Sequence, residues 1–313
     1  MKSPLNKFEK TWGFLKTQHG FRRAPLLTLL RSASWYWRCL SGRAAIVDLR
    51  RWNVQMFLPP KWHGFGKFIF AFRENYEPEL TYLESILSPG RVFVDVGANF
   101  GIYTMVASRL VGKAGRVVAF EPSVQSFPVL QKNISLNNLE NVLSFRAALS
   151  DKESRAWLYH ALDPSGNSLG RDPSLEGARE EVILKSLDNV LEENGIDRVD
   201  VIKVDVEGAE ELVLHGAARN LITHSPVVIF EFNPGCAARL GLSPDGARGF
   251  LESLGYEFVV LGDCAKSKNP ALRPTYFNII AIPKQSVGQF SHLFHSPRGE
   301  SLVLRSKEAC KGL

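Results

Sequence analysis

Hydrophobic residues in the middle of the chain form short runs, each followed by a helical pattern. The run at 92–96 is apolar except for Asp95. It leads through a glycine-containing turn into 102–110, where Ile102, Val106 and Leu110 recur at helical spacing. Short apolar runs rich in β-branched residues are typical of strands buried on both faces, and a three-to-four-residue recurrence indicates an amphipathic helix. The pattern therefore predicts a strand, a tight turn and a helix start.

The same alternation continues toward the C-terminus. We expect further strands at 116–120, 142–147, 200–205, 226–231, 256–261 and 276–282, and helices at 121–136, 186–193, 209–221 and 244–254. Alternating strands and helices with right-handed crossovers predict a doubly wound, mostly parallel α/β sheet of seven strands. Ligands of such sheets bind outside the carboxyl ends of the strands. The residues expected at one crevice are Asp95, Glu121, Ala147, Asp205 and Glu231. Residues 151–184 interrupt the alternation, and we interpret them as an antiparallel insertion over this crevice.

The chain before residue 92 has a different pattern. An amphipathic helix is expected from Pro25 to Leu40, short strands at 45–49 and 67–72, and a helix at 77–87 that Pro89-Gly90 ends. We divide the chain into an N-terminal extension at 1–75, a main domain at 76–283 and a C-terminal tail at 284–313. The tail shows no clear pattern.

Charge is unevenly distributed along a chain of ordinary globular composition. The 313 residues carry a net charge of +6, and the first 43 hold nine Lys and Arg residues against one acid, Glu9. Two interpretations of this segment stay open: a helix that caps the main domain, or a helix lying on an anionic membrane face. No apolar run is long enough for a spanning helix, and no secretory-signal pattern is present. We expect a cytoplasmic protein, with peripheral membrane contact as the alternative.

The cysteine spacing and the basic N-terminal segment limit which metals and macromolecules the chain is expected to bind. The four cysteines lack the paired spacing of a zinc site or a redox dithiol. No pattern of a known RNA-binding fold accompanies the basic segment, so no nucleic-acid partner is expected. The oligomeric state is not predicted by the sequence.

The turn after the first strand indicates which nucleotide-like ligand is bound. Its spacing, Asp95-x-Gly97-x-x-x-Gly101, differs from the G-x-G-x-x-G fingerprint of dinucleotide-binding folds. A carboxylate in the turn would repel a pyrophosphate, whereas it attracts the cationic amino-acid end of S-adenosylmethionine. Glu121 is placed to accept hydrogen bonds from the ribose hydroxyls of S-adenosylmethionine or of NAD. A nicotinamide-dependent oxidoreductase and a non-catalytic nucleoside-binding protein therefore remain alternatives.

An ordered set of motifs over residues 76–282 resembles the FkbM family of S-adenosylmethionine-dependent methyltransferases. The motifs are Tyr76-Glu77-Pro78-Glu79, the stretch 94–104, Phe120-Glu121-Pro122, Asp151 after Ala148-Leu149-Ser150, Ser186-Leu187-Asp188 and the stretch 202–210. The resemblance implies a class I methyltransferase fold with its seventh strand antiparallel. It also implies methyl transfer to a hydroxyl of a sugar, glycan or secondary metabolite. We predict as cofactor-binding residues Asp95, Gly97, Asn99, Gly101, Tyr103, Thr104, Glu121, Pro122, Ala147 and Asp205.

The acceptor hydroxyl needs activation, because an alcohol is a poor nucleophile at neutral pH and a general base adds about 10²–10⁴-fold. We predict Asp205 and Glu207 as the catalytic carboxylates. A less favoured alternative is a divalent cation held by Asp205, Glu231 and Asn233. In a structural interpretation, Glu210 caps its helix and Glu231 has no catalytic role. Of the histidines, we expect His215 to interact with a helix C-terminus and His160 to lie in a surface loop.

Overall fold

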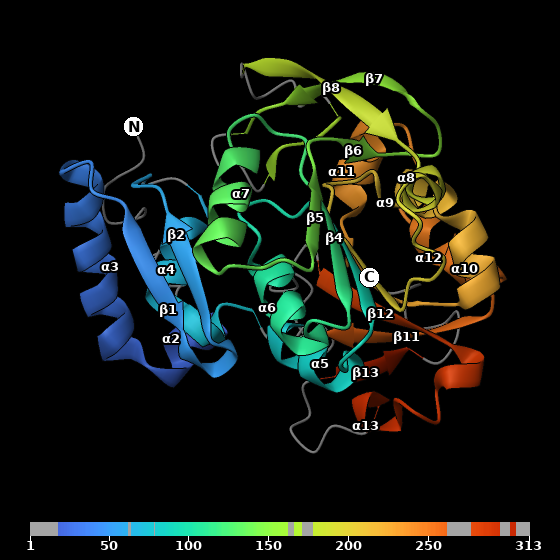
Figure 1. The fold of residues 1–313 in the computed structure, drawn as a ribbon, viewed down its shortest axis with the longest axis horizontal. Helices are drawn as coiled ribbons and strands as arrows, with labels where there is room; N and C mark the ends of the chain where they lie inside the picture. The colour runs from blue at the N-terminus through green and yellow to red at the C-terminus, as the bar shows by residue number, and fades with distance from the viewer. Residues whose placement is uncertain are drawn as a thin grey trace.

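The computed structural model describes residues 18–61, 64–77, 79–161, 166–170, 178–261, 277–294 and 301–304. An eight-stranded sheet lies at its centre, in the order β13-β11-β12-β10-β9-β3-β4-β5 (Figure 1). These strands are β3 (Val92–Val96), β4 (Arg116–Phe120), β5 (Val142–Phe145), β9 (Val201–Val204), β10 (Val227–Phe232), β11 (Tyr256–Leu261), β12 (Phe277–Pro283) and β13 (Ser301–Leu304). The strands from β10 to β5 are parallel, and β12 is antiparallel to both β10 and β11. The predicted class I methyltransferase fold with seven strands is confirmed, and β13 adds an eighth.

Helices cover both faces of the sheet (Figure 1). On one face lie α5 (Glu79–Ile86), α6 (Ile102–Val111) and α7 (Phe127–Leu136). On the other lie α8 (Leu187–Glu193), α9 (Glu210–His215), α10 (Ala218–His224) and α12 (Gly246–Ser253). Successive strand residues alternate between the two cores: Phe93 packs with α6, and Val94 packs with α8 and α9. Two further short helices are α11 (Pro234–Arg239) and α13 (Ser291–Phe294).

The predicted insertion is a small separate sheet. It contains β6 (Ala148–Leu149), β7 (Ser154–Tyr159) and β8 (Arg179–Lys185), with β7 antiparallel to β8. Ser186 follows directly after β8. Its side chain accepts a hydrogen bond from the N–H of Asn189 and caps α8, as expected. Residues 162–165 and 171–177 of the insertion lie outside the described residues.

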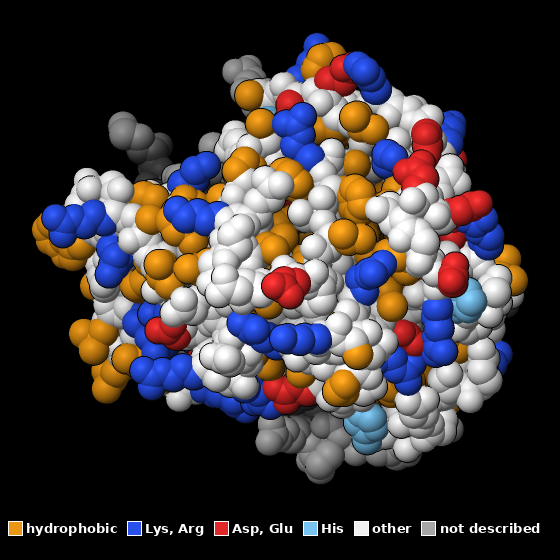
Figure 2. All heavy atoms as spheres, in the orientation of Figure 1, with side chains coloured by type: hydrophobic (Ala, Val, Ile, Leu, Met, Phe, Trp, Pro, Cys, Tyr) orange, Lys and Arg blue, Asp and Glu red, His pale blue; other side chains and the backbone are white. Residues whose placement is uncertain are grey.

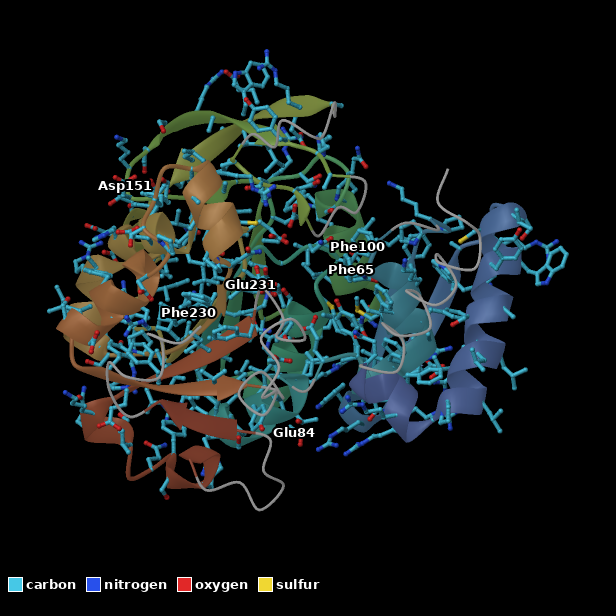
Figure 3. All side chains as sticks on the ribbon, turned by 180° about the vertical axis from the view of Figure 1, so that it is seen from behind. Phe65, Glu84, Phe100, Asp151, Phe230 and Glu231 are labelled. Atoms are coloured by element: carbon cyan, nitrogen blue, oxygen red, sulfur yellow. The ribbon has the colours of Figure 1, made fainter. Side chains whose placement is uncertain are left out.

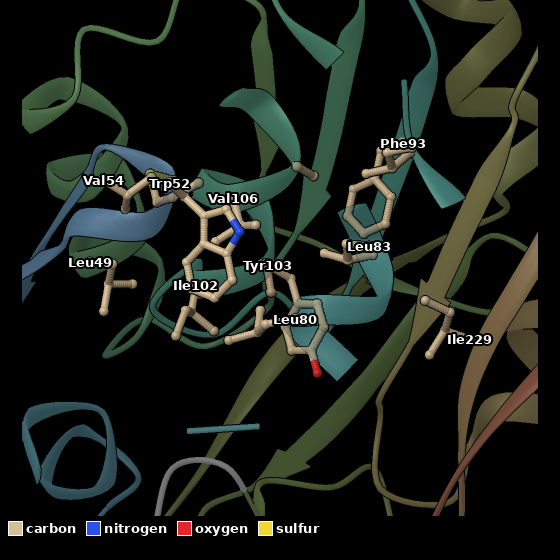
Figure 4. Close-up of a cluster of buried hydrophobic side chains, with 14 of the residues drawn as sticks. Leu49, Trp52, Val54, Leu80, Leu83, Phe93, Ile102, Tyr103, Val106 and Ile229 are labelled. Atoms are coloured by element: carbon tan, nitrogen blue, oxygen red, sulfur yellow. The ribbon is translucent and has the colours of Figure 1, made fainter. Parts of the chain in front are cut away.

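The N-terminal extension is built into the main hydrophobic core. It contains α2 (His19–Arg23), α3 (Pro25–Leu40), β1 (Ala45–Leu49), β2 (Val54–Leu58) and α4 (Gly66–Phe72), with β1 and β2 forming an antiparallel hairpin. Leu49 and Trp52 of the hairpin region belong to the same core as Ile102 and Val106 of α6 (Figure 4). The extension therefore packs against α6 and α7, the helices that cover this face of the sheet, and it shares their hydrophobic core (Figure 1).

Two expectations about the extension need correction or addition. The run 67–72, predicted as a strand, is helix α4, and β2 was not predicted. A short continuous apolar run suits a buried strand and a buried helix equally, so tertiary packing decides. Here Phe65, just before α4, packs against Phe100 of the glycine turn, with ring centroids 4.7 Å apart and the rings tilted by 44° (Figure 3). This contact places α4 beside the turn.

Three expectations about the main domain also need correction. The helix predicted from 121 begins at Phe127, because the Glu121 carboxylate accepts the N–H of Ser123 and holds this segment in a turn. The helix predicted at 209–221 is two helices, α9 and α10. They separate where Gly216 passes so close to the backbone oxygen of Ser150 that a Cβ would lie 2.0 Å from it. The strand predicted at 142–147 ends at Phe145, which leaves Ala147 in the connection to β6.

Candidate active site

A cavity opens at the carboxyl ends of β3, β4 and β9, where the topology places ligands of such sheets. Its volume is about 560 Å³, including the part open to solvent. Six predicted residues line it: Gly97, Asn99, Glu121, Pro122, Ala147 and Asp205. Leu158, Asn167 and Leu169 of the insertion also line it, so the insertion forms one wall as expected. The strand-end residues thus meet in one cavity, except Asp95 and Glu231.

The turn after β3 is shaped by close backbone contacts. The N–H groups of Gly97 and Ala98 both donate to the carbonyl of Phe120, at 3.0 and 2.9 Å. Gly97 has a φ of +78°, and a Cβ there would lie 1.9 Å from the carbonyl oxygen of Asp205. Glycine is therefore required, since a side chain would force β3 away from the end of β9. This close contact places the turn and Asp205 in the same wall of the cavity.

Glu121 is fixed at the end of β4 by backbone donors. Its Oε2 accepts the N–H of Asn99 at 2.8 Å, and its Oε1 accepts the N–H of Ser123 at 2.9 Å. The residue is 6% exposed, and burial raises the pKa of its carboxyl to about 7. Each carboxylate oxygen can accept a further hydrogen bond. A ligand with two adjacent hydroxyls, such as a ribose, matches this arrangement.

Asp205 is held by a buried lysine. Lys203 Nζ lies 3.2 Å from Asp205 Oδ2 and 3.8 Å from Asp95 Oδ1. Asp95 and Lys203 are register partners on neighbouring parallel strands, and Asp205 follows two residues later, so alternation places all three on one face. Lys203 also lies over the ring of Tyr103, 4.5 Å from its centroid. Burial lowers the pKa of Lys203, but Asp205, Asp95 and Glu77 outweigh burial and raise it above its ordinary value.

Four predicted cofactor residues lie behind the cavity wall. Asp95 is 0% exposed and its Oδ2 accepts the Thr104 hydroxyl at 2.5 Å. The Tyr103 hydroxyl donates to the Glu77 carboxylate. At Gly101 a Cβ would lie 2.4 Å from Leu130 Cδ1, so this glycine serves packing. None of the four lines the cavity. Their direct contact with a cofactor stays a prediction, and the structure shows them bonded to or packed against other residues behind the wall.

The two predicted catalytic carboxylates have different surroundings. Glu207 does not line the cavity. Its Oε2 accepts from Asn233 Nδ2 and Cys236 Sγ, each at 3.2 Å, and its carbonyl accepts the Ser168 hydroxyl at 2.8 Å. Ser168 thereby ties the insertion to the turn after β9. Asp205 is the better placed of the two for contact with a ligand in the cavity.

Two further acids, Glu210 and Glu231, lie near Glu207. Glu210 Oε1 accepts the N–H groups of Val206 and Gly208 at 3.2 Å, so it holds the turn before α9, and no side chain among the described residues caps the first N–H groups of that helix. Glu231, at the end of β10 in Figure 3, lines a separate, smaller pocket. Burial first, then the charges of Asp205 and Glu207, raise the pKa of Glu231 to about 9. Among the described residues no group of three or more His, Cys, Asp or Glu side chains could hold a metal ion.

The two histidines lie outside the lining of the cavity. His215 ends α9, as expected, and its ring lies 4.2 Å from that of Phe250. His160 Nε2 lies 3.2 Å from Glu180 Oε1, with 12% of its side chain exposed, so it is less exposed than a surface loop implied.

Sequence reasoning missed Lys203, which the structure places at the centre of the polar contacts. A signal was present: a lone lysine in an apolar strand, two residues before Asp205. The two-residue period puts both side chains on one face of the sheet. Glu77 was part of a recognised motif, but its contact with Tyr103 joins α6 to a segment 26 residues away, which no local pattern specifies.

Known proteins resemble this chain over the same region. The profile of the methyltransferase FkbM domain family matches residues 95–258. Methyltransferase sdnD of Sordaria araneosa is 31% identical over 153 residues, covering 39% of this chain and 59% of that protein. The 31-O-demethyl-FK506 methyltransferase FkbM of Streptomyces tacrolimicus is 26% identical over 181 residues, covering 48% of this chain and 69% of that protein.

The comparison with solved structures gives a weaker likeness. The crystal structure of methyltransferase FkbM from Methylobacillus flagellatus KT is 14% identical, with a TM-score of 0.42, over 70% of this chain and 54% of that one. The chain spans 59% and 57% of the length of two curated methyltransferases that it matches.

Proposed function

We propose that this chain, which belongs to the FkbM methyltransferase family, transfers a methyl group from S-adenosylmethionine to a hydroxyl of a small-molecule or glycan acceptor. The observation that carries the proposal is the placement of Glu121 and Asp205 in the wall of one cavity, at the ends of β4 and β9. The first carboxylate suits a ribose and the second suits an acceptor hydroxyl. Family membership favours this function over a nicotinamide-dependent oxidoreductase.

The residues of the cavity fit the cofactor. Val96, Leu149 and Leu158 provide apolar walls for a nucleoside base, and Glu121 provides paired acceptors for a ribose. Gly97 lets the turn after β3 lie against the end of β9, which keeps Asp205 in the same wall as Glu121. When bound, S-adenosylmethionine supplies a methyl group already activated by the sulfonium.

Asp205 is suited to accept the proton of the acceptor hydroxyl. Lys203 Nζ holds its Oδ2, while 41% of the Asp205 side chain is exposed, so the carboxylate is both oriented and accessible. In-line displacement depends mainly on holding the acceptor oxygen and the methyl group in geometry, which contributes about 7–11 kcal/mol in favourable cases. Asp205 contributes orientation together with proton acceptance. One relative is named a 31-O-demethyl-FK506 methyltransferase, and that name supports oxygen as the acceptor atom here.

Two measurements test the proposal. Calorimetry of the full chain is expected to show binding of S-adenosylhomocysteine and no binding of NAD. Incubation of the chain with ¹³C-methyl-labelled S-adenosylmethionine and a metabolite extract is expected to yield a product with a labelled methoxy signal. Binding of NAD alone would contradict the transferase, and a labelled N-methyl or C-methyl product would contradict the hydroxyl acceptor.

A further inference from the structure

The outer face of α3 is apolar, although it points away from the protein. Leu26, Leu30, Ala33, Trp37 and Leu40 recur at spacings of four and three residues, and all five are exposed. The four large side chains are 76%, 71%, 69% and 61% exposed, in chain order. The spacing places them in one stripe along the helix. Single exposed apolar residues are ordinary, whereas a continuous stripe marks an interaction surface.

The stripe is widened by Leu27, Leu29 and Tyr36, all exposed. We call the exposed face formed by these eight residues the α3 outer face. It contains no charged residue. In Figures 1 and 3 α3 lies at the outer edge of the molecule, and Figure 2 shows hydrophobic side chains at that edge beside Lys and Arg side chains.

The orientation of α3 is fixed by its inner face. Trp35 is 1% exposed and its ring lies 5.0 Å from that of Phe70 in α4. Arg31 donates to the carbonyl of Ala71 and Arg38 to that of Ala44, so both guanidinium groups bond to the body of the protein. The helix cannot turn its apolar stripe inward without breaking these contacts.

The surroundings of the α3 outer face are strongly basic. Arg22 and Arg23 precede the helix, Arg43 follows it, and all three are exposed. Residues 1–43 contain nine Lys and Arg residues against Glu9, a net charge of +8, whereas the full chain carries +6. Residues 44–313 are therefore slightly acidic, and among the described residues three exposed arginines directly flank α3 in the chain.

We propose that α3 lies on an anionic lipid bilayer, with its outer face in the boundary between headgroups and acyl chains. Apolar residues on one helix face with flanking basic residues are the pattern of interfacial helices, and the amphipathic rings of Tyr36 and Trp37 suit that depth. The 16 residues of α3 extend about 24 Å at 1.5 Å each. No helix within the described residues is long and apolar enough to cross a membrane. The helix lies along the bilayer surface.

Charge favours lipid over a second copy of this chain. The four-three spacing of the α3 outer face also suits pairing with another helix. Such pairing would bring together two copies of a helix that is flanked by the exposed Arg22, Arg23 and Arg43, and these like charges repel each other. An anionic bilayer covers the same apolar face and attracts the flanking arginines, each by about 1 kcal/mol near such a surface.

Vesicle flotation of the full chain tests the proposal. The vesicles contain phosphatidylcholine alone or phosphatidylcholine mixed with phosphatidylglycerol. The wild-type chain is expected to float with the anionic vesicles and to dissociate as salt rises. Leu30→Glu is expected to lower the partition coefficient by roughly tenfold or more, because it places a charge where a leucine is buried in lipid. The matched control is Ile222→Glu on α10, at a residue 66% exposed, which should bind as the wild type does.

Three outcomes would overturn the proposal. The first is unchanged flotation of Leu30→Glu. The second is absence of wild-type flotation with anionic vesicles. The third is a wild-type dimer in analytical ultracentrifugation that Leu30→Glu dissociates and that added anionic vesicles leave intact. This result would assign the α3 outer face to a second copy of the chain. Equal thermal unfolding midpoints of both variants and the wild type show that folding is unaffected. Trp37→Phe provides a second test: quenching of tryptophan emission by brominated lipid should decrease, although the aromatic side chain is retained.

Discussion

Two groups of polar residues lie near the end of β9 and differ in whether they line the cavity. On the cavity side, Asp205 has 41% of its side chain exposed and lines the cavity with Glu121. Behind the wall, Lys203 has 7% of its side chain exposed and Asp95 none, with the ring of Tyr103 beside them. Both groups depend on the register of β3 and β9. The open group can bind and react, whereas the closed group can only hold the open one in place.

This difference explains why the two aspartates Asp95 and Asp205 have different roles. A charge removed from water is costly unless it is paired, and pairing with Lys203 offsets that cost for Asp95. Burial raises the pKa of Asp95, and the charge of Lys203 acts against that increase. Asp205 shares the same lysine from the solvent side. Substitutions in the two groups should therefore affect different quantities: turnover and affinity on the open side, stability on the closed side.

The largest effect is expected for Asp205→Asn. The amide keeps the size of the side chain but cannot accept the proton of the acceptor hydroxyl. Turnover should fall by about 10²–10⁴-fold. The affinity for S-adenosylhomocysteine should change far less, because Glu121 and the glycine turn are unaltered. Single-turnover methyl transfer and calorimetry measure the two quantities.

A matched control for this substitution is Glu207→Gln. Its side chain bonds to Asn233 and Cys236 and does not line the cavity. We expect a smaller loss of turnover than for Asp205→Asn. A larger loss in Glu207→Gln, with Asp205→Asn near wild type, would transfer the base role to Glu207.

The next effect is expected for Lys203→Met, on the closed side. The substitution keeps most of the side-chain volume but leaves Asp95 buried without its partner. Removing one member of a buried ion pair costs about 3–5 kcal/mol, so the free energy of unfolding should fall by that amount at neutral pH. Denaturant unfolding measures it. Lys185→Met, which removes a half-exposed pair with Glu193, is the control and should cost under about 1 kcal/mol. A loss as small as the control's in Lys203→Met would show that the buried pair does not stabilise the fold.

The order of strands and helices was predictable because it depends on periodic patterns. Buried parallel strands such as β3 and β9 are nearly continuous apolar runs, and the glycines and prolines between elements mark the turns. The secondary-structure predictions that were wrong concern segments whose structure is determined by tertiary packing and not by the local sequence pattern. The run 67–72 became helix α4 beside Phe65 and Phe100, and Gly216 divided a helix because it lies against Ser150.

The site was partly predictable for a similar reason. Topology places strand-end residues at one edge of the sheet, and Glu121 and Asp205 do meet in one cavity. Which side of the wall each residue occupies depends on side-chain contacts across the chain. Asp95 is predicted to contact the ligand, and that stays a prediction; its bond to Thr104 and its proximity to Lys203 place it outside the lining of the cavity. No local pattern specifies such contacts.

On the open side, Glu121→Gln should weaken cofactor binding. Hydrogen bonds to a charged group contribute about 1.5–3 kcal/mol. The variant loses the charge and presents an N–H₂ group to the donor of Asn99 or Ser123. We expect the dissociation constant of S-adenosylhomocysteine to rise by about 10- to 100-fold. Glu181→Gln, at a half-exposed position on β8, is the control and should bind as the wild type does. Equal affinity in the two variants would remove Glu121 from the ribose role.

The smallest effect is a pH dependence that belongs to the open side alone. Burial raises the pKa of Glu121 to about 7 in the empty cavity, so the carboxyl is partly protonated at neutral pH. Ribose hydroxyls donate to the ionised form. Affinity for S-adenosylhomocysteine should therefore rise roughly tenfold between about pH 6 and pH 8 and then level off.

The free energy of unfolding should change with pH in the opposite direction to the affinity. Because the folded pKa exceeds the ordinary value of 4.5, the empty protein binds the extra proton, and its stability falls as pH rises from 4.5 to about 7. The buried carboxyls of Glu77 and Glu210, also with a pKa of about 7, titrate in the same window. The informative quantity is thus the difference between wild type and Glu121→Gln, and a pH profile of affinity that is identical in both would contradict the assignment.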